Sequence, residues 1–254
     1  MRKTTKLSCC LVLLSVVLVS VTAGAEGRSS SQEPWGCPFL TQKVVYPPGT
    51  SATFRFWKVG VGCAKVERLF KAFWRHANAG RCEGSRCIVS FPGGWQCSGF
   101  SAAESAETKG AEFGCYKGPR AQFRAYPLMR GRGFLSPSRK IWCSASALSA
   151  LDDRHLVCVS KVAPGHFSGV GAVLGVHGPP QLCEELTAAE AEQQPPPLGC
   201  SLNFDSGAPV LPAGSTAEDG GFRCAASQTE ITCTYGEGNA QHGFVISQTT
   251  VAAT

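Results

Sequence analysis

Cysteine is the residue type with the clearest chemistry in this chain. The sequence has 14 cysteines among 254 residues, and two of them, Cys9 and Cys10, lie in an apolar stretch near the N-terminus, which leaves twelve. None of the twelve forms a Cys-x-x-Cys pair, and the nearest spacing is Cys82 to Cys87. Structural zinc sites favour closer ligand spacings. An even number of cysteines in an exported chain therefore predicts disulfides, with no metal and no other cofactor.

The twelve cysteines divide evenly around Tyr126-Pro127. The first six leave their pairing open, because six cysteines allow fifteen connectivities; they are Cys37, Cys63, Cys82, Cys87, Cys97 and Cys115. For the last six we guess sequential pairs, because each pair would bracket a hairpin or a loop. These pairs are Cys143–Cys158, Cys183–Cys200 and Cys224–Cys233.

Histidine is the other residue type that could do chemistry, but the residues around the histidines give little support for an active site. The chain has 5 histidines, and the best placed is His242, beside Gly243 in a glycine-rich loop. No Gly-x-Ser-x-Gly, His-Glu-x-x-His or Gly-x-x-x-x-Gly-Lys motif accompanies them. An extracellular hydrolase that uses His242 or His155 stays open, but a loop histidine is the simpler interpretation.

Residues 63–77 carry the clearest helical pattern. Apolar side chains recur there at helical spacing, as expected for a core-facing stripe: Val66, Leu69, Phe70, Phe73 and Trp74. The opposite side is basic and carries Lys65, Arg68, Lys71 and Arg75. This side is either a solvated face or a binding surface for an anionic partner.

Short β-rich runs surround this helix and fill the rest of the chain. Thr53-Phe-Arg-Phe56 and residues 113–126 alternate as strands do, and Gly221–Ser247 is typical of a hairpin followed by one more strand. We expect a short acidic helix over Cys183–Glu192 and a Thr/Ala tail from Thr249. The predicted fold class is α+β to mainly β, with two small disulfide-rich domains, the first built from one amphipathic helix on a short antiparallel sheet.

The N-terminal region indicates export. Three basic residues precede the apolar run Leu7–Val21, and small residues follow it, which is the layout of a signal peptide; a retained anchor is the alternative. We therefore predict a signal peptide over 1–25, a disordered lead-in over 26–36, an α+β domain over 37–126 and a mainly β domain over 127–254. The mature chain is expected outside the cell or in the cell envelope, without an integral membrane segment.

Charge differs between the two predicted domains. Residues 26–126 hold 14 Lys+Arg and 7 Asp+Glu, a net of +7, whereas residues 127–254 hold 7 and 11, a net of −4. The basic first half favours an anionic partner. Because the chain is predicted to be exported and lacks nucleic-acid-binding motifs, we expect an envelope polymer or a secreted protein as partner, and no nucleic acid.

The second half resembles a family of exported actinobacterial domains without an assigned activity. Phe134-Leu-Ser-Pro-Ser-Arg-Lys-Ile-Trp-Cys143 followed by Leu156-Val-Cys158 is similar to its opening F-x-S-P-S-G-N-I-x-C…V-x-C. The segment from Gly221 to Ser247 is similar to its ending G-x-F-x-C…G-I-x-C…G-H-G-F-x-I-S. Gly-Asn is usual in the family where this chain has Arg139-Lys140, and Gly where it has Gln241, so the tight first turn is in question. The resemblance implies a disulfide-held β domain.

These features predict a non-enzymatic binding or structural module of the cell envelope. The absence of catalytic motifs and the split charge are the basis for that expectation. The alternatives are the hydrolase above and an inhibitor of a secreted enzyme, which would use the basic helix face or the proline-rich loop over 192–200.

Overall fold

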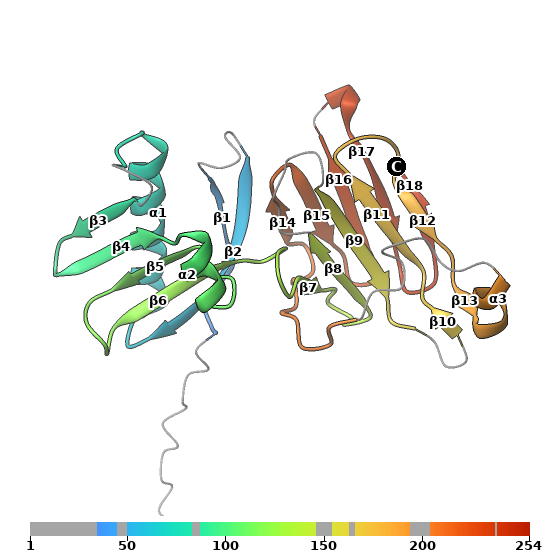
Figure 1. Ribbon diagram of the computed structural model, residues 1–254, viewed down its shortest axis with the longest axis horizontal. Helices are drawn as coiled ribbons and strands as arrows, with labels where there is room; N and C mark the ends of the chain where they lie inside the picture. Colours follow the sequence, from blue (N-terminus) through green and yellow to red (C-terminus); the bar gives the residue numbers. More distant parts are fainter. Residues whose placement is uncertain are drawn as a thin grey trace, which may run out of the picture. The chain divides into compact units, whose positions relative to one another are not determined.

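The computed structural model describes residues 35–44, 50–82, 87–145, 154–162, 166–193, 204–236 and 238–254. The expected signal peptide, Cys200 and residues 194–199 of the proline-rich loop lie outside these ranges. Antiparallel β-sheets dominate, with three α-helices and several disulfides, which confirms the predicted fold class (Figure 1).

The first half is a curved sheet with one long helix. The helices are α1 (Cys63–Asn78) and α2 (Ala102–Glu107). The strands are β1 (Leu40–Lys43), β2 (Ser51–Val59), β3 (Ile88–Phe91), β4 (Trp95–Gly99), β5 (Phe113–Tyr116) and β6 (Gln122–Pro127). They are ordered β2-β6-β5-β4-β3, and β1 pairs with the free side of β2.

Helix α1 covers one face of this sheet, as its apolar stripe predicted. Phe70 packs edge-on against Phe56 with ring centroids 5.0 Å apart, and Phe73 lies 4.3 Å from Phe113. The helix ends one residue after the predicted Ala77, and Gly80 follows it with φ +67°, a conformation that glycine adopts at little cost. The apolar core of the first half is therefore an aromatic cluster between α1 and the sheet.

The second half is built from two sheets that pack face to face around a shared apolar cluster (Figure 1). One sheet contains β7 (Phe134–Leu135), β8 (Ile141–Ala145), β9 (His155–Ser160), β11 (Gly171–Gly175) and β12 (Gln181–Cys183). The other contains β14 (Thr216–Asp219), β15 (Phe222–Ala226), β16 (Ile231–Tyr235), β17 (His242–Ile246) and β18 (Val251–Ala253). Three short elements complete it: β10 (His166–Ser168), β13 (Leu186–Thr187) and α3 (Ala188–Gln193).

The two halves meet in one hydrogen-bonded sheet. Asp219 of β14 pairs with Ala52 of β2, which joins the strands of the first half to β14–β18. Gln32–Thr254 is one compact unit, although the apolar core of the described residues divides into three clusters. One spans residues 44–125, a second spans residues 128–246, and a small third cluster consists of Leu135, Trp142, Val157, Val159 and Ala208. The two-domain division at 126/127 stays a prediction.

Two local expectations in the second half were wrong. The acidic helix begins at Ala188 instead of near Cys183, because the Thr187 hydroxyl accepts a hydrogen bond from the Glu190 amide (3.3 Å) and the Glu190 carboxylate accepts one from the Thr187 amide (2.8 Å). The expected tail after Thr249 is instead strand β18, paired with β17, because the Ser247 hydroxyl caps a turn that reverses the chain.

The turn after β7 is closed by the side chain of Ser136. The Ser136 hydroxyl accepts hydrogen bonds from the amides of Lys140 (3.3 Å) and Ile141 (3.1 Å), and Arg139 occupies the left-handed region with φ 58°. That conformation costs a non-glycine residue on the order of 1–2 kcal/mol.

We therefore expect Arg139→Gly to raise the free energy of unfolding by about 0.5–1 kcal/mol, since the added chain entropy of glycine offsets part of the relieved strain. Lys109 has the same φ of 58° and should respond in the same direction. Lys117→Gly, at an exposed position without positive φ, should lower stability. Chemical denaturation of the three variants measures this, and an unstabilised Arg139→Gly would contradict the account.

Candidate functional site

Four side chains form a two-by-two pattern on the face of the first sheet opposite to α1. Strands β2 and β6 pair so that Trp57 lies opposite Arg124 and Arg55 lies opposite Tyr126. Successive residues of a strand point to opposite faces, and the intervening phenylalanines are buried in the aromatic core. Each rung of this surface therefore places one arginine beside one aromatic ring.

The two arginines contact rings instead of carboxylates. The Arg55 guanidinium lies 4.3 Å from the ring centroid of Trp35 and 5.6 Å from that of Tyr126, and the Arg124 guanidinium lies 5.4 Å from that of Trp57. Trp35 is held there by a bridge to Trp57. In the described parts of the chain, no salt bridge involves Arg55 or Arg124.

Burial leaves the charge of Arg55 poorly compensated. Desolvation lowers the pKa of Arg55 and the positive charge of Arg132 lowers it further, whereas Tyr126 and the Asp205 carboxylate raise it in part. An opposite charge placed close to a partly buried cation stabilises its charged form, so an anion at Arg55 would offset this shift.

These residues line a groove with a volume of about 1550 Å³. We call it the arginine–aromatic groove and define it by Trp35, Arg55, Trp57, Arg124 and Tyr126, with α2 and Arg130–Arg132 along its border. The indole Nε1 of Trp74 is buried and has no hydrogen-bond partner in the described structure. Trp74 lies on α1, and its ring packs against Phe54 (6.0 Å between ring centroids) on the other face of the sheet, so this donor does not face Arg55 or Arg124.

An ion-pair network borders the groove. Arg130 donates from Nε to Asp219 Oδ2 (2.6 Å) and from a terminal nitrogen to Asp219 Oδ1 (2.7 Å), and it also contacts Glu112. Burial raises the pKa of Glu112 more than the neighbouring Arg130 lowers it. The hydrogen bond and the charge of Asp219 hold the Arg130 pKa above its ordinary value despite burial. Arg130 is thus a neutralised structural cation, unlike Arg55.

A smaller cavity of about 520 Å³ offers less chemistry. It lies beside β1, and its walls come from Cys37–Phe39, Thr41, Thr53 and residues around 210–216, none of them charged. The arginine–aromatic groove is therefore the better candidate site.

The disulfides include two of the three sequential pairs expected in the second half. Cys143–Cys158 and Cys224–Cys233 are bonded, and Cys183 is bonded too, while Cys200 lies outside the described residues. The pairing that was left open in the first half is Cys37–Cys63, Cys82–Cys87 and Cys97–Cys115. Cys143, Cys158 and Cys233 lie close enough together to suggest a metal site, but their sulfurs are bonded in disulfides and offer no thiolate.

The basic helix face lies away from the groove, and none of its four residues lines it. Lys71 forms an exposed salt bridge with Glu67 (2.7 Å), and the Lys65 ammonium lies 5.9 Å from the Trp95 ring. Arg68 and Arg75 are exposed. This face therefore fits a solvated surface at least as well as a binding surface.

His242 joins the two sheets of the second half. Its Nε2 lies 3.2 Å from the Gly175 carbonyl oxygen of β11, and its ring lies 5.8 Å from Tyr235. It lines neither cavity. His155, at the start of β9, lines neither cavity either. The structure therefore gives His242 a packing position between sheets.

Sequence reasoning did not single out Arg55 and Arg124. A usable signal was present, because both arginines alternate with buried apolar residues in predicted strands, as do Trp57 and Tyr126. Finding the groove, however, required knowing that these two strands are neighbours.

Comparisons with protein-family models, with curated proteins and with solved structures found no match. Among the described residues, no helix is long and apolar enough to cross a membrane.

Proposed function

We propose that this chain is an exported, non-enzymatic binding protein whose arginine–aromatic groove holds an acidic saccharide polymer of the cell envelope. The observation that carries the proposal is the pair Arg55 and Arg124, which face aromatic rings and form no salt bridge with a carboxylate of the described residues. A carboxylate or sulfate on a bound ligand would supply that partner in bidentate geometry.

The rings of the groove favour a ligand with flat, partly apolar faces. Trp35, Trp57 and Tyr126 alternate with the arginines, and tryptophan combines a large apolar surface with one polar donor. A sugar ring presents an apolar face to such a surface. Bases of single-stranded nucleic acid also stack on aromatic rings; the expected export of the chain favours the saccharide.

Binding is favoured over hydrolysis by the composition of the groove. None of the described residues that line it is a histidine, and its best placed carboxyl, Glu112, is paired with Arg130. The hydrolase hypothesis relied on His242 or His155, which lie elsewhere. The loop suggested for an inhibitor falls largely outside the described residues.

A direct test is titration of the oxidised protein with an acidic oligogalacturonide, with a neutral oligosaccharide of the same length and with a single-stranded oligonucleotide. We expect saturable binding of the oligogalacturonide, weakened by salt because the contacts are ionic. Equal affinity for the neutral oligosaccharide would contradict a role for the charge of the ligand. Tighter binding of the oligonucleotide would mean that the groove binds nucleic acid instead of a saccharide.

Binding should also depend on pH through Glu112. Its pKa is raised, so as pH rises above the ordinary glutamate range Glu112 loses its proton and adds negative charge beside Arg130, where Asp219 already lies. Affinity for an acidic saccharide should therefore fall over that interval. Glu112→Gln should bind more tightly at neutral pH and lose this pH dependence, whereas an unchanged pH profile in the variant would contradict the prediction.

A further inference from the structure

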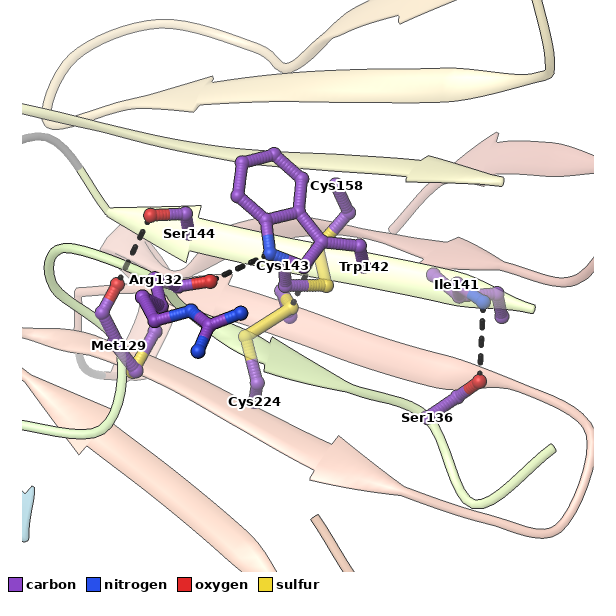
Figure 2. The surroundings of a disulfide bond; sticks show 10 residues. Met129, Arg132, Ser136, Ile141, Trp142, Cys143, Ser144, Cys158 and Cys224 are labelled. Carbon is purple, nitrogen blue, oxygen red and sulfur yellow. Dashed lines mark hydrogen bonds between the residues drawn. A yellow bond between two sulfur atoms is a disulfide. The ribbon is translucent and has the colours of Figure 1, made fainter. Parts of the chain in front are cut away.

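Two disulfides lie against each other in the core of the second half. Cys143–Cys158 joins β8 to β9 in one sheet, and Cys224–Cys233 joins β15 to β16 in the other. Each pair occupies directly opposed positions on neighbouring strands, and all four residues have no exposed surface. Figure 2 shows the first bridge with Cys224 next to it.

The closest approach between the bridges is Cys158 Sγ to Cys233 Sγ, at 3.7 Å. The sulfurs of Cys143, Cys158 and Cys233 all lie within 4.8 Å of one another, and Cys224 is outside that group. A sulfur of one bridge is thus already placed near its counterpart in the facing sheet, with no polypeptide between them.

We propose that these four cysteines form a disulfide-exchange centre, in which two-electron reduction converts the two bridges within the sheets into one Cys158–Cys233 bridge between the sheets. The electrons come from an external dithiol, which is itself oxidised to a disulfide. The centre is independent of the function proposed for the groove.

The exchange step follows from which sulfurs face each other. If the dithiol reduces Cys224–Cys233, the Cys233 thiolate attacks Cys158 Sγ, the Cys143–Cys158 bond breaks, and Cys143 leaves as a thiolate that takes up a proton. If Cys143–Cys158 is reduced first, the Cys158 thiolate attacks Cys233 Sγ and Cys224 leaves instead. Both routes give one Cys158–Cys233 disulfide and thiols at Cys143 and Cys224.

The product would restrict the unfolded chain more than either native bridge does. The native bridges span 15 and 9 residues, whereas Cys158 and Cys233 are 75 residues apart. A disulfide that closes a longer loop restricts the unfolded chain more. The reduced centre would therefore hold the two sheets together covalently, which neither native bridge does.

Paired substitutions test the geometry without requiring a reductant to enter the core. The double variant Cys143→Ser with Cys224→Ser retains Cys158 and Cys233. We expect these two cysteines to form a disulfide on oxidative refolding, so that thiol titration detects neither of them. The matched control, Cys158→Ser with Cys233→Ser, leaves Cys143 and Cys224, which should keep their thiols and give a lower melting temperature. A folded first variant with two free thiols would overturn the proposal.

The wild-type chain provides the second measurement if the first variant does not fold. The oxidised protein is treated with a limiting amount of dithiothreitol, trapped by alkylation in acid and mapped by mass spectrometry. The proposal predicts alkylated Cys143 and Cys224 together with a linked Cys158–Cys233 peptide. Alkylation of both members of one native pair, with the other pair intact, would overturn it.

Discussion

Replacing Asp219 with asparagine should lower the free energy of unfolding by about 2–3 kcal/mol. Asp219 is almost fully buried, with 5% of its side chain exposed, and it binds Arg130 through both carboxylate oxygens. The substitution removes the negative charge. The Arg130 side chain, which is 21% exposed, then keeps Glu112 as its remaining carboxylate partner. Loss of one partner of a buried pair is costly because the other charge stays desolvated.

The chain contains a matched control for this effect. Arg132 and Asp205 form a second bidentate pair at 2.8 Å, but their side chains are 53% and 30% exposed. Exposed pairs contribute roughly 0–1 kcal/mol, so Asp205→Asn should change stability little. Urea denaturation of both variants measures the difference. Equal losses would mean that burial does not set the strength of the Arg130 pair.

Removal of both groove arginines should abolish most binding of an acidic saccharide. A hydrogen bond to a charged group contributes about 1.5–3 kcal/mol, so Arg55→Ala with Arg124→Ala should weaken binding roughly a hundredfold or more. Arg55→Lys should recover only part of the loss, because lysine keeps the charge without the planar fork that stacks on Trp35. Isothermal titration with oligogalacturonide gives these affinities.

A second double variant tests whether the acidic saccharide binds to the groove or to the basic helix face. Arg68→Ala with Arg75→Ala removes the same amount of charge from exposed positions on α1, and it should reduce affinity only slightly through the long-range field, an effect that salt removes. The groove assignment fails if the helix variant loses as much affinity as the groove variant at high salt.

Local patterns explain why part of this structure could be predicted. The spacing of Val66, Phe70 and Phe73 shows a helical face directly, and Cys224 and Cys233 bracket a hairpin whose turn lies between them. Such features depend on residues close in sequence. Helix α1 and the hairpin were therefore predicted correctly from the residues themselves.

The candidate site depends on contacts that the sequence does not display. Arg55 and Tyr126 are directly opposed although they are far apart in the chain, and Cys158 meets Cys233 only because two sheets pack together. The sequence displays Lys65 and its basic helix neighbours. It does not show which cations lack a negatively charged partner. Arg55 is distinguished by its surroundings, which only the fold defines.

The five tryptophans allow the most direct test of the groove as a binding site. Trp35 and Trp57 line it. Trp74 packs on the α1 face of the sheet, Trp95 lies beside Lys65 of the helix face, and Trp142 donates its indole N–H to the Arg132 carbonyl oxygen (Figure 2). Indole N–H resonances of the isotopically labelled protein can be followed by NMR during titration with oligogalacturonide. The account predicts shifts at Trp35 and Trp57, with Trp74 and Trp95 unchanged. A shift confined to Trp95 would contradict it and assign binding to the basic face of α1.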